Sequence, residues 1–292
     1  MPTTLVTTAE LARHLDDPHW LLLDCRFDLA DPGAGEAAWR AGHIPGALHA
    51  DLDRDLSAPV TPATGRHPLP APTDFAATLA RWGVGPRTQV VAYDAGGGMI
   101  AARLWWMLRW LGHDAAAVLD GGLAAWVAAG GTLVTGAATA RPPAGFAARP
   151  RPGMACDADE VRHALAAGAA LVDLRAAERF SGEVEPLDPV AGHVPGAINL
   201  PFQLQLDAGN RLRPAAELAS LWRERIGTRT GTELICMCGS GVTACHGLLA
   251  LEVAGIRGAR LYAGSWSEWI RDPQRPVASI YIRGGSAIVR AR

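Results

Sequence analysis

The sequence has no lysine, no long apolar run and almost no net charge. All 27 basic side chains are arginine, so the chain offers no lysine amine for a Schiff base. A net charge of −2 gives no excess of positive charge for nucleic acid or an anionic membrane, and neither partner is expected. No apolar stretch is long enough to span a bilayer, and the first residues show neither the basic nor the apolar part of a secretory signal.

Cysteine is scarce, with five among the 292 residues. Their number is odd, and three lie close together at positions 236, 238 and 245, which is unlike a disulfide framework. We therefore expect thiols in a reducing compartment, most simply the cytoplasm. The cysteine cluster lacks two separated Cys-x-x-Cys pairs, so zinc is a poor fit, and we expect neither a metal nor a cofactor.

The stretch around Cys238 has the pattern of a nucleophile on a turn. Residues 233–235 predict a buried strand and residues 247–253 predict a helix, which places Cys238 between the two. The turn, Cys-Gly-Ser-Gly-Val-Thr, consists mostly of small residues, so successive backbone N–H groups can point inward. These groups and the positive end of the helix favour an anion, and the thiolate is the reactive form of cysteine.

The sequence also repeats itself at the scale of a domain. A predicted strand at 20–24 is followed by a Gly-His-Ile-Pro-Gly turn at 42–46. A second predicted strand at 170–173 is followed by a Gly-His-Val-Pro-Gly turn at 192–196, at nearly the same spacing. Such a repeat indicates a duplicated fold.

The repeat continues into the two Gly-rich turns. The predicted strand that ends at Asp94 matches the one that ends at Cys238, and an apolar helix follows each turn. Short apolar strands alternating with helices predict an α/β fold, with a parallel sheet flanked by helices in each half. The Pro-rich stretch 136–153 predicts a linker between a domain at 1–135 and a second at 154–292.

The loop and the repeat together resemble the rhodanese superfamily, in its two-domain 3-mercaptopyruvate sulfurtransferase form. The resemblance covers nearly the whole chain and implies two tandem rhodanese-like domains, of which only the second is catalytic. Asp94 takes the place of the cysteine in the first, and a carboxylate cannot accept a sulfane sulfur. The resemblance implies that Cys238 takes sulfur from a small anionic donor as a persulfide and passes it to a thiol or to cyanide.

The same resemblance implies the other residues of the site. Ser240 would form a relay with His67 and Asp53, although a loop-stabilising hydroxyl or a helix cap is the simpler reading of Ser240. Arg179 would hold the anionic end of the donor, because a guanidinium can donate two parallel hydrogen bonds; the alternative is a salt bridge to Glu183 or Glu185. The loop residues that would bind the donor beside Cys238 are Gly239, Gly241, Val242 and Thr243.

The identity of the donor rests on two opposing observations. Thiosulfate enzymes of this family carry basic residues where this chain has Gly239 and Ser240, which favours 3-mercaptopyruvate. Mercaptopyruvate enzymes carry a second arginine after a Glu-Pro pair, where this chain has Leu187 and Asp188, which weakens that choice. A thiosulfate sulfurtransferase is therefore the alternative.

Two readings outside sulfur transfer are also open. A dual-specificity phosphatase shares the fold, but its loop is longer and ends in arginine, whereas Ala244 follows Thr243 here. A non-enzymatic sulfur carrier or redox-sensing module is less favoured, because the Cys238 loop is intact. The sequence does not indicate an oligomeric state.

Overall fold

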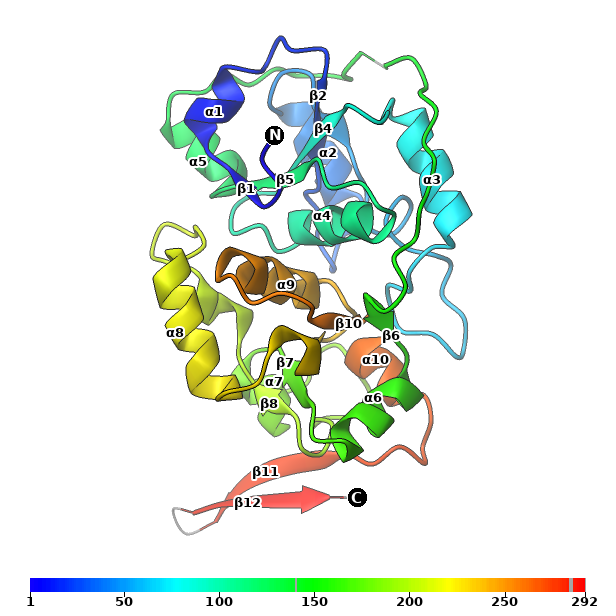
Figure 1. Ribbon diagram of the computed structural model, residues 1–292, viewed down its shortest axis with the longest axis vertical. Helices are drawn as coiled ribbons and strands as arrows, with labels where there is room; N and C mark the ends of the chain where they lie inside the picture. The colour runs from blue at the N-terminus through cyan, green and yellow to red at the C-terminus, as the bar shows by residue number, and fades with distance from the viewer. Residues whose placement is uncertain (140, 284–285, 292) are drawn as a thin grey trace. The chain divides into compact units, whose positions relative to one another are not determined.

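The computed structural model describes residues 1–139, 141–283 and 286–291, and Figure 1 shows its helices and strands. The chain forms two compact units. The first unit comprises Met1–Ala58, Leu69–Pro152 and Leu206–Leu212, and the second comprises Pro59–Pro68, Gly153–Gln205 and Arg213–Arg292. Two short segments, 59–68 and 206–212, therefore belong to the unit that does not contain their sequence neighbours.

The first unit is built on a five-stranded parallel sheet with the strand order β1-β5-β4-β2-β3. Its strands are β1 (Leu5–Val6), β2 (Trp20–Asp24), β3 (Leu48–His49), β4 (Gln89–Tyr93) and β5 (Ala116–Leu119). Its helices are α1 (Thr8–Ala12), α2 (Ala34–Ala41), α3 (Pro72–Arg81), α4 (Ala101–Trp110) and α5 (Gly122–Ala128).

Apolar side chains cover both faces of this sheet. Leu22, Val91 and Tyr93 lie in one core cluster with Trp126 of α5. Their strand neighbours, such as Leu23, point to the opposite face and are equally buried. Strands buried on both faces read as continuous apolar runs, which is why the sequence of β2 predicts this element at the observed bounds.

The second unit repeats this sheet, with the order β6-β10-β9-β7-β8. Its parallel strands are β6 (Ala155–Cys156), β7 (Ala170–Asp173), β8 (Ile198–Asn199), β9 (Leu234–Met237) and β10 (Arg260–Tyr262). Its α-helices are α6 (Ala158–Ala166), α7 (Ala177–Ser181), α8 (Ala215–Ile226), α9 (Thr243–Val253) and α10 (Ser265–Trp269), and its 3-10 turns are η1 (Phe202–Gln205) and η2 (Gly231–Glu233). An antiparallel hairpin of β11 (Ala278–Arg283) and β12 (Ser286–Ala291) completes it. The sequence pattern does not predict this hairpin.

The elements on either side of Cys238 differ slightly from their predicted bounds. Strand β9 begins one residue later than predicted, because the carboxylate of Glu233 accepts the backbone N–H of Thr230 in the turn η2. Helix α9 begins at Thr243, four residues earlier than predicted, and the side chains from Ala244 to Leu251 are buried. The sheet and its long buried helix are the scaffold that positions the Cys238 loop.

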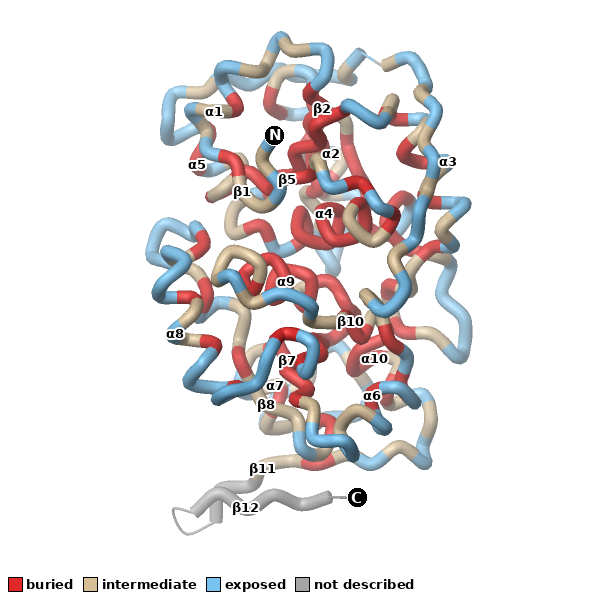
Figure 2. The backbone as a smooth tube through the Cα atoms, viewed as in Figure 1, coloured by how far each residue is buried: buried red, intermediate tan, exposed pale blue. Residues whose placement is uncertain are grey.

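The Pro-rich stretch packs along the first unit. The N–H of Ala144 donates to the carbonyl oxygen of Ala80 at 3.0 Å, and that of Arg149 to Leu111 at 2.9 Å. Figure 2 shows that this stretch is mostly exposed or half-buried, whereas the strands are buried. None of the described helices has the length and apolar composition needed to cross a bilayer.

Candidate active site

The thiol of Cys238 lies in the loop between β9 and α9. Its Sγ accepts the backbone N–H of Gly241 at 3.2 Å, and the side chain is 2% exposed. The backbone of the same residue is fixed to α10: its N–H donates to Ser265 Oγ at 3.1 Å, and its carbonyl accepts from Trp266 N–H at 3.0 Å. The backbone of Cys238 is therefore held in place, and its sulfur already accepts one backbone N–H group.

Gly241 gives the loop its sharp turn. Its φ of +78° lies in the left-handed region, and a Cβ there would overlap the carbonyl oxygen of Ala263. Other N–H groups of the loop have no acceptor within hydrogen-bonding distance among the described residues; these belong to Ser240, Val242, Thr243 and Ala244. Unsatisfied N–H groups at the start of a helix form a cradle for an anion.

Ser240 of this loop contacts an imidazole from far earlier in the chain. Its Oγ lies 2.7 Å from Nδ1 of His67, and both side chains are buried. The segment 59–68 that carries His67 is held in the second unit by the N–H of Arg66, which donates to Ser267 Oγ at 3.0 Å. The structure thus brings together the serine and histidine of the predicted relay.

Arg179, on α7, is tied to two carboxylates. Its Nε and Nη2 donate to Glu185 at 3.1 and 2.7 Å, and its Nη2 also reaches Asp188 at 3.2 Å. Of the two salt-bridge partners considered above, Glu185 is the one observed. The same guanidinium also lies at the loop, because its Nη1 is 3.5 Å from the position that a Cβ would take at Gly239.

The sequence analysis missed a second guanidinium at this position. Arg66 pairs with Asp188 through Nη1, and its Nη2 lies 2.9 Å from the Cβ position of Gly239. The residue directly precedes His67, but no local pattern in the sequence indicates its contact with Asp188. A residue other than glycine at position 239 would push against this arginine.

Asp53, the predicted acid of the relay, lies in the first unit, beyond β3. Its N–H donates to Asp51 Oδ1 at 3.0 Å, and burial together with the negative charge of Asp51 raises the pKa of its carboxyl group. Its part in a relay stays a prediction.

A match to a family model decides the family of this chain. The model of the rhodanese-like domain matches residues 7–129 and 157–272, one copy in each half. The chain belongs to the rhodanese family. It is an α/β protein with two rhodanese-like domains, as the sequence predicts.

Similar proteins carry sulfurtransferase names. A probable 3-mercaptopyruvate sulfurtransferase of Pseudomonas aeruginosa is 51% identical, over 94% of this chain and 98% of its own length. A putative thiosulfate sulfurtransferase, SseB, of Mycobacterium tuberculosis is 41% identical, over 94% and 96%. The solved structure of the 3-mercaptopyruvate sulfotransferase SseA from Escherichia coli matches with a TM-score of 0.78 and 35% identity, and covers 91% of this chain and all of that one. This rhodanese is therefore an enzyme that transfers sulfur.

The other four cysteines of this rhodanese are also buried free thiols. Burial raises the pKa of Cys25 and Cys236 well above that of an ordinary thiol, and raises that of Cys156 to about 12. On β9, Ile235 and Met237 belong to one core cluster, so the alternation of the strand turns Cys236 to the other face of the sheet. Among the described residues, no group of three metal-binding side chains is close enough to hold a metal ion.

The first rhodanese domain fills the corresponding loop with a carboxylate. Asp94 Oδ1 accepts the N–H groups of Gly96 and Gly98 at 3.1 Å, and Oδ2 accepts those of Ile100 and Ala101 at 2.9 and 3.2 Å. Burial raises the pKa of this carboxyl group, while the four hydrogen bonds oppose that rise. The loop thus binds an anion that the chain itself supplies.

Ser265 is another contact residue that the sequence analysis did not single out. Its φ is +53°, which is rare for a residue with a side chain, and the matching position of the first domain is Gly122 with a φ of +57°. Its Oγ donates to the carbonyl of Tyr262 at 2.8 Å and accepts from Cys238 N–H. The repeat itself was the available signal, because it aligns a serine with a glycine.

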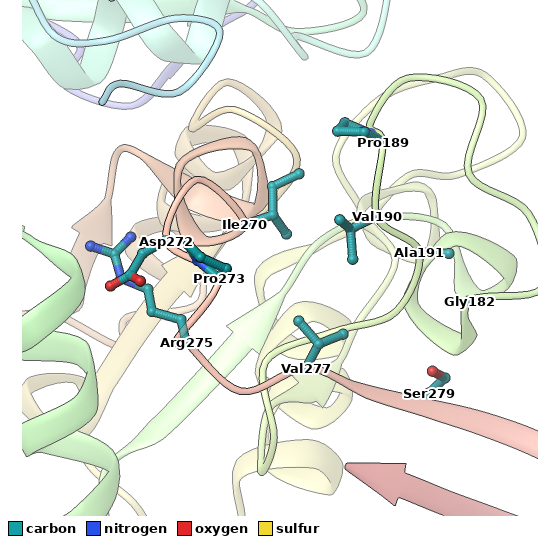
Figure 3. A pocket seen from close by; sticks show the side chains of 10 residues that line it. All are labelled: Gly182, Pro189, Val190, Ala191, Ile270, Asp272, Pro273, Arg275, Val277 and Ser279. Atoms are coloured by element: carbon teal, nitrogen blue, oxygen red, sulfur yellow. The ribbon is translucent and has the colours of Figure 1, made fainter. Parts of the chain in front are cut away.

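A cavity of about 410 Å³ in the second unit lies apart from these residues (Figure 3). Its lining combines apolar side chains with the ion pair of Arg275 and Asp272. The residues around it are Gly182, Pro189, Val190, Ala191, Ile270, Asp272, Pro273, Arg275, Val277 and Ser279. None of the predicted site residues lines this cavity.

Proposed function

We propose that this rhodanese moves sulfur from 3-mercaptopyruvate to a thiol or to cyanide through a persulfide on Cys238. The observation that carries the proposal is the loop itself: a thiol that already accepts one N–H, surrounded by others that have no acceptor. The relative with 51% identity, whose name is probable 3-mercaptopyruvate sulfurtransferase, supports the choice of donor.

In the first half-reaction, the Cys238 thiolate attacks the sulfur of the donor. A sulfur–sulfur bond forms, the carbon–sulfur bond of the donor breaks, and its electron pair passes to the carbon as the enolate of pyruvate. The transferred sulfur loses its proton, and the enolate carbon takes up a proton in turn, so the products are pyruvate and an anionic persulfide. The cradle of N–H groups, with Gly239, Gly241, Val242 and Thr243 around it, stabilises the negative charge on the outer sulfur.

In the second half-reaction, an acceptor thiolate or cyanide attacks the outer sulfur. The sulfur–sulfur bond to Cys238 breaks, its electron pair returns to the Cys238 sulfur, and the acceptor leaves as a persulfide or as thiocyanate. Two separate half-reactions on one nucleophile predict ping-pong kinetics.

Ser240 and His67 are placed to move the proton that the enolate needs. A buried hydroxyl and imidazole 2.7 Å apart can pass a proton along their hydrogen bond. We assign Asp53 to the acid of this relay by its resemblance to the family, and Arg179 to the anionic end of the donor.

Thiosulfate is the second candidate donor, and one observation favours it. Thiosulfate enzymes place positive charge in the loop, and here Arg66 and Arg179 bring two guanidinium groups to Gly239 from outside the loop. The M. tuberculosis relative, whose name is putative thiosulfate sulfurtransferase, also favours thiosulfate as the donor. The deciding measurement is kcat/KM for both donors on the purified protein; higher efficiency with thiosulfate would overturn the choice of 3-mercaptopyruvate and leave sulfur transfer in place.

We also propose a cytoplasmic site of action. All five cysteines are buried free thiols, which suits a reducing compartment. Fractionation of the native cells, with detection of the protein in each fraction, tests this location.

A further inference from the structure

Two arginines and a buried aspartate meet beside the residue that follows the nucleophile. Asp188 lies between the guanidinium groups, with Oδ1 paired to Arg66 and Oδ2 at 3.2 Å from Arg179. Both guanidinium groups also approach the Cβ position of Gly239, at 2.9 and 3.5 Å. This carboxylate is held between two arginines as a bound substrate carboxylate would be.

The charges around the loop are fully matched before any donor arrives. The guanidinium groups of Arg66, Arg175 and Arg179 face the carboxylates of Asp173, Glu185 and Asp188. A donor anion added to this set would leave one negative charge without a partner, close to the thiolate. Burying an unpaired charge is costly, so the donor has to exchange with a carboxylate that is already there.

Asp188 is the carboxylate that can leave. Glu185 accepts from Arg175 and Arg179 and from the N–H groups of Leu187 and Asp188. Asp188 accepts only from the two arginines among the described residues, and burial raises the pKa of its carboxyl group. Its neighbour Leu187 is 46% exposed, so the segment that carries Asp188 lies next to solvent.

We propose that Arg66 and Arg179 together bind the carboxylate of the donor, and that this carboxylate takes the place of Asp188 between them. The proposal rests on the function proposed above, a small donor that carries a carboxylate and a transferable sulfur. Gly239 adjoins Cys238, and consecutive Cα atoms are about 3.8 Å apart, so few bonds can separate the two groups of the donor. A three-carbon 2-oxo acid with sulfur on its third carbon has this size.

Arg66 takes the role of the second arginine, which is missing after Glu185-Pro186 in this chain. Leu187 stands in place of the second arginine, and Asp188 follows it. The guanidinium comes from the segment 59–68 and meets this aspartate. In this chain the second guanidinium of the anion site thus comes from a different segment.

The test compares Arg66→Ala, Arg66→Lys and Asp188→Asn with the wild type, in assays of pyruvate release from 3-mercaptopyruvate. Arg66→Ala should raise KM about ten- to a hundredfold with kcat nearly unchanged, since one charged contact is lost. Arg66→Lys should recover part of the affinity. Asp188→Asn should lower KM at least about threefold, because a neutral amide competes poorly for the arginines.

The matched control is Arg271→Ala. Arg271 is exposed and donates to the carbonyl of Thr64, in the segment that carries Arg66, at 3.2 Å. This variant should leave KM unchanged. The melting temperature of each variant shows whether it folds. If Arg66→Ala does not fold, the change in KM of Arg66→Lys tests the proposal.

Two results would overturn the proposal. A fall in kcat with unchanged KM in Arg66→Ala would mean that Arg66 only positions His67. A raised KM in Asp188→Asn would mean that Asp188 orients the arginines rather than competing with the donor.

Calorimetry separates the failure of this proposal from that of the proposed function. The probe is 2-oxobutyrate, which has the carboxylate of the donor but no sulfur, titrated into Cys238→Ser protein with and without Arg66→Ala. Arg66→Ala should weaken its binding about tenfold or more, whichever donor the enzyme prefers. Equal affinity in the two proteins would overturn the two-arginine site, whereas a preference for thiosulfate in the kinetic assay would overturn only the choice of donor.

Discussion

The loop after β4 and the loop after β9 stand at the same place in two copies of one fold. In the first, Asp94 accepts four backbone N–H groups, and the loop has no donor left for a ligand anion at those positions. In the second, the Cys238 sulfur accepts one N–H group, and the neighbouring ones have no acceptor among the described residues. The same backbone loop therefore binds a carboxylate of the chain in one domain and leaves N–H groups open to a ligand in the other.

The largest effect is expected when the second loop is made like the first. Cys238→Asp removes the proposed nucleophile, so sulfur transfer should fall by more than about a thousandfold. The new carboxylate can accept the N–H groups of the loop, so the melting temperature should not fall. Pyruvate release and thermal unfolding measure the two quantities, and Cys236→Ala is the control that should retain most of its activity. Substantial transfer by Cys238→Asp would mean that another residue carries the sulfur.

The converse change removes the anion from the first loop. Asp94→Ala leaves four buried N–H groups without their acceptor, and each such loss costs about 1–3 kcal/mol before the loop relaxes. Relief from burying the carboxylate offsets part of this cost, so we expect the free energy of unfolding to fall by about 2–4 kcal/mol. Urea unfolding measures it, with Asp94→Asn as the milder control. An unchanged midpoint would show that the carboxylate does not hold this loop.

The loop after Asp94 has Gly96 at the position of Ser240, so the first domain has no counterpart of the Ser240–His67 pair. We expect this pair to affect kcat and not KM. Ser240→Ala and His67→Ala should each lower kcat about ten- to a hundredfold with KM little changed, as expected for a lost proton relay. The double variant should be no slower than the worse single one, because the two side chains act together. Additive losses in a steady-state assay would mean that the two act independently.

The smallest effect concerns the residue behind each loop, Ser265 and its counterpart Gly122. Ser265→Gly relieves the left-handed backbone but loses the acceptor for Cys238 N–H, whereas Ser265→Ala loses the acceptor and keeps the strain. We therefore expect Ser265→Ala to be less stable than Ser265→Gly by about 1 kcal/mol. Equal unfolding midpoints in urea would show that the backbone at 265 is not strained.

Local pattern was sufficient to predict the duplicated fold and the central strands β2, β4, β7 and β9. The runs at β2 and β7 are apolar throughout because both faces of the sheet are covered, and their bounds match the prediction. The start of α9 was placed four residues late, because Thr243, Ala244 and the residues after them are small or polar and lack an apolar pattern. The sequence thus predicted the type of these elements correctly but not the residue at which α9 begins.

The site could be predicted only in part. The loop, Ser240 and His67 were identified by resemblance, and the missing arginine after the Glu-Pro pair was visible in the sequence. Arg66 was not, because its contact with Asp188 depends on where the segment 59–68 lies in the folded unit. A contact between residues more than a hundred positions apart leaves no local pattern to detect.

The placement of the segment 59–68 also sets the order in which the enzyme can become active during its synthesis. The imidazole of His67 and the guanidinium of Arg66 leave the ribosome about 170 residues before the thiol that they accompany. Until the last quarter of the chain emerges, the segment has no β9–α9 loop to dock against. A nascent chain, or one that ends early, therefore carries these side chains without the nucleophile, and a fragment that starts at 153 carries the nucleophile without them. Although the two halves are similar, we expect that neither half alone transfers sulfur by the proposed mechanism.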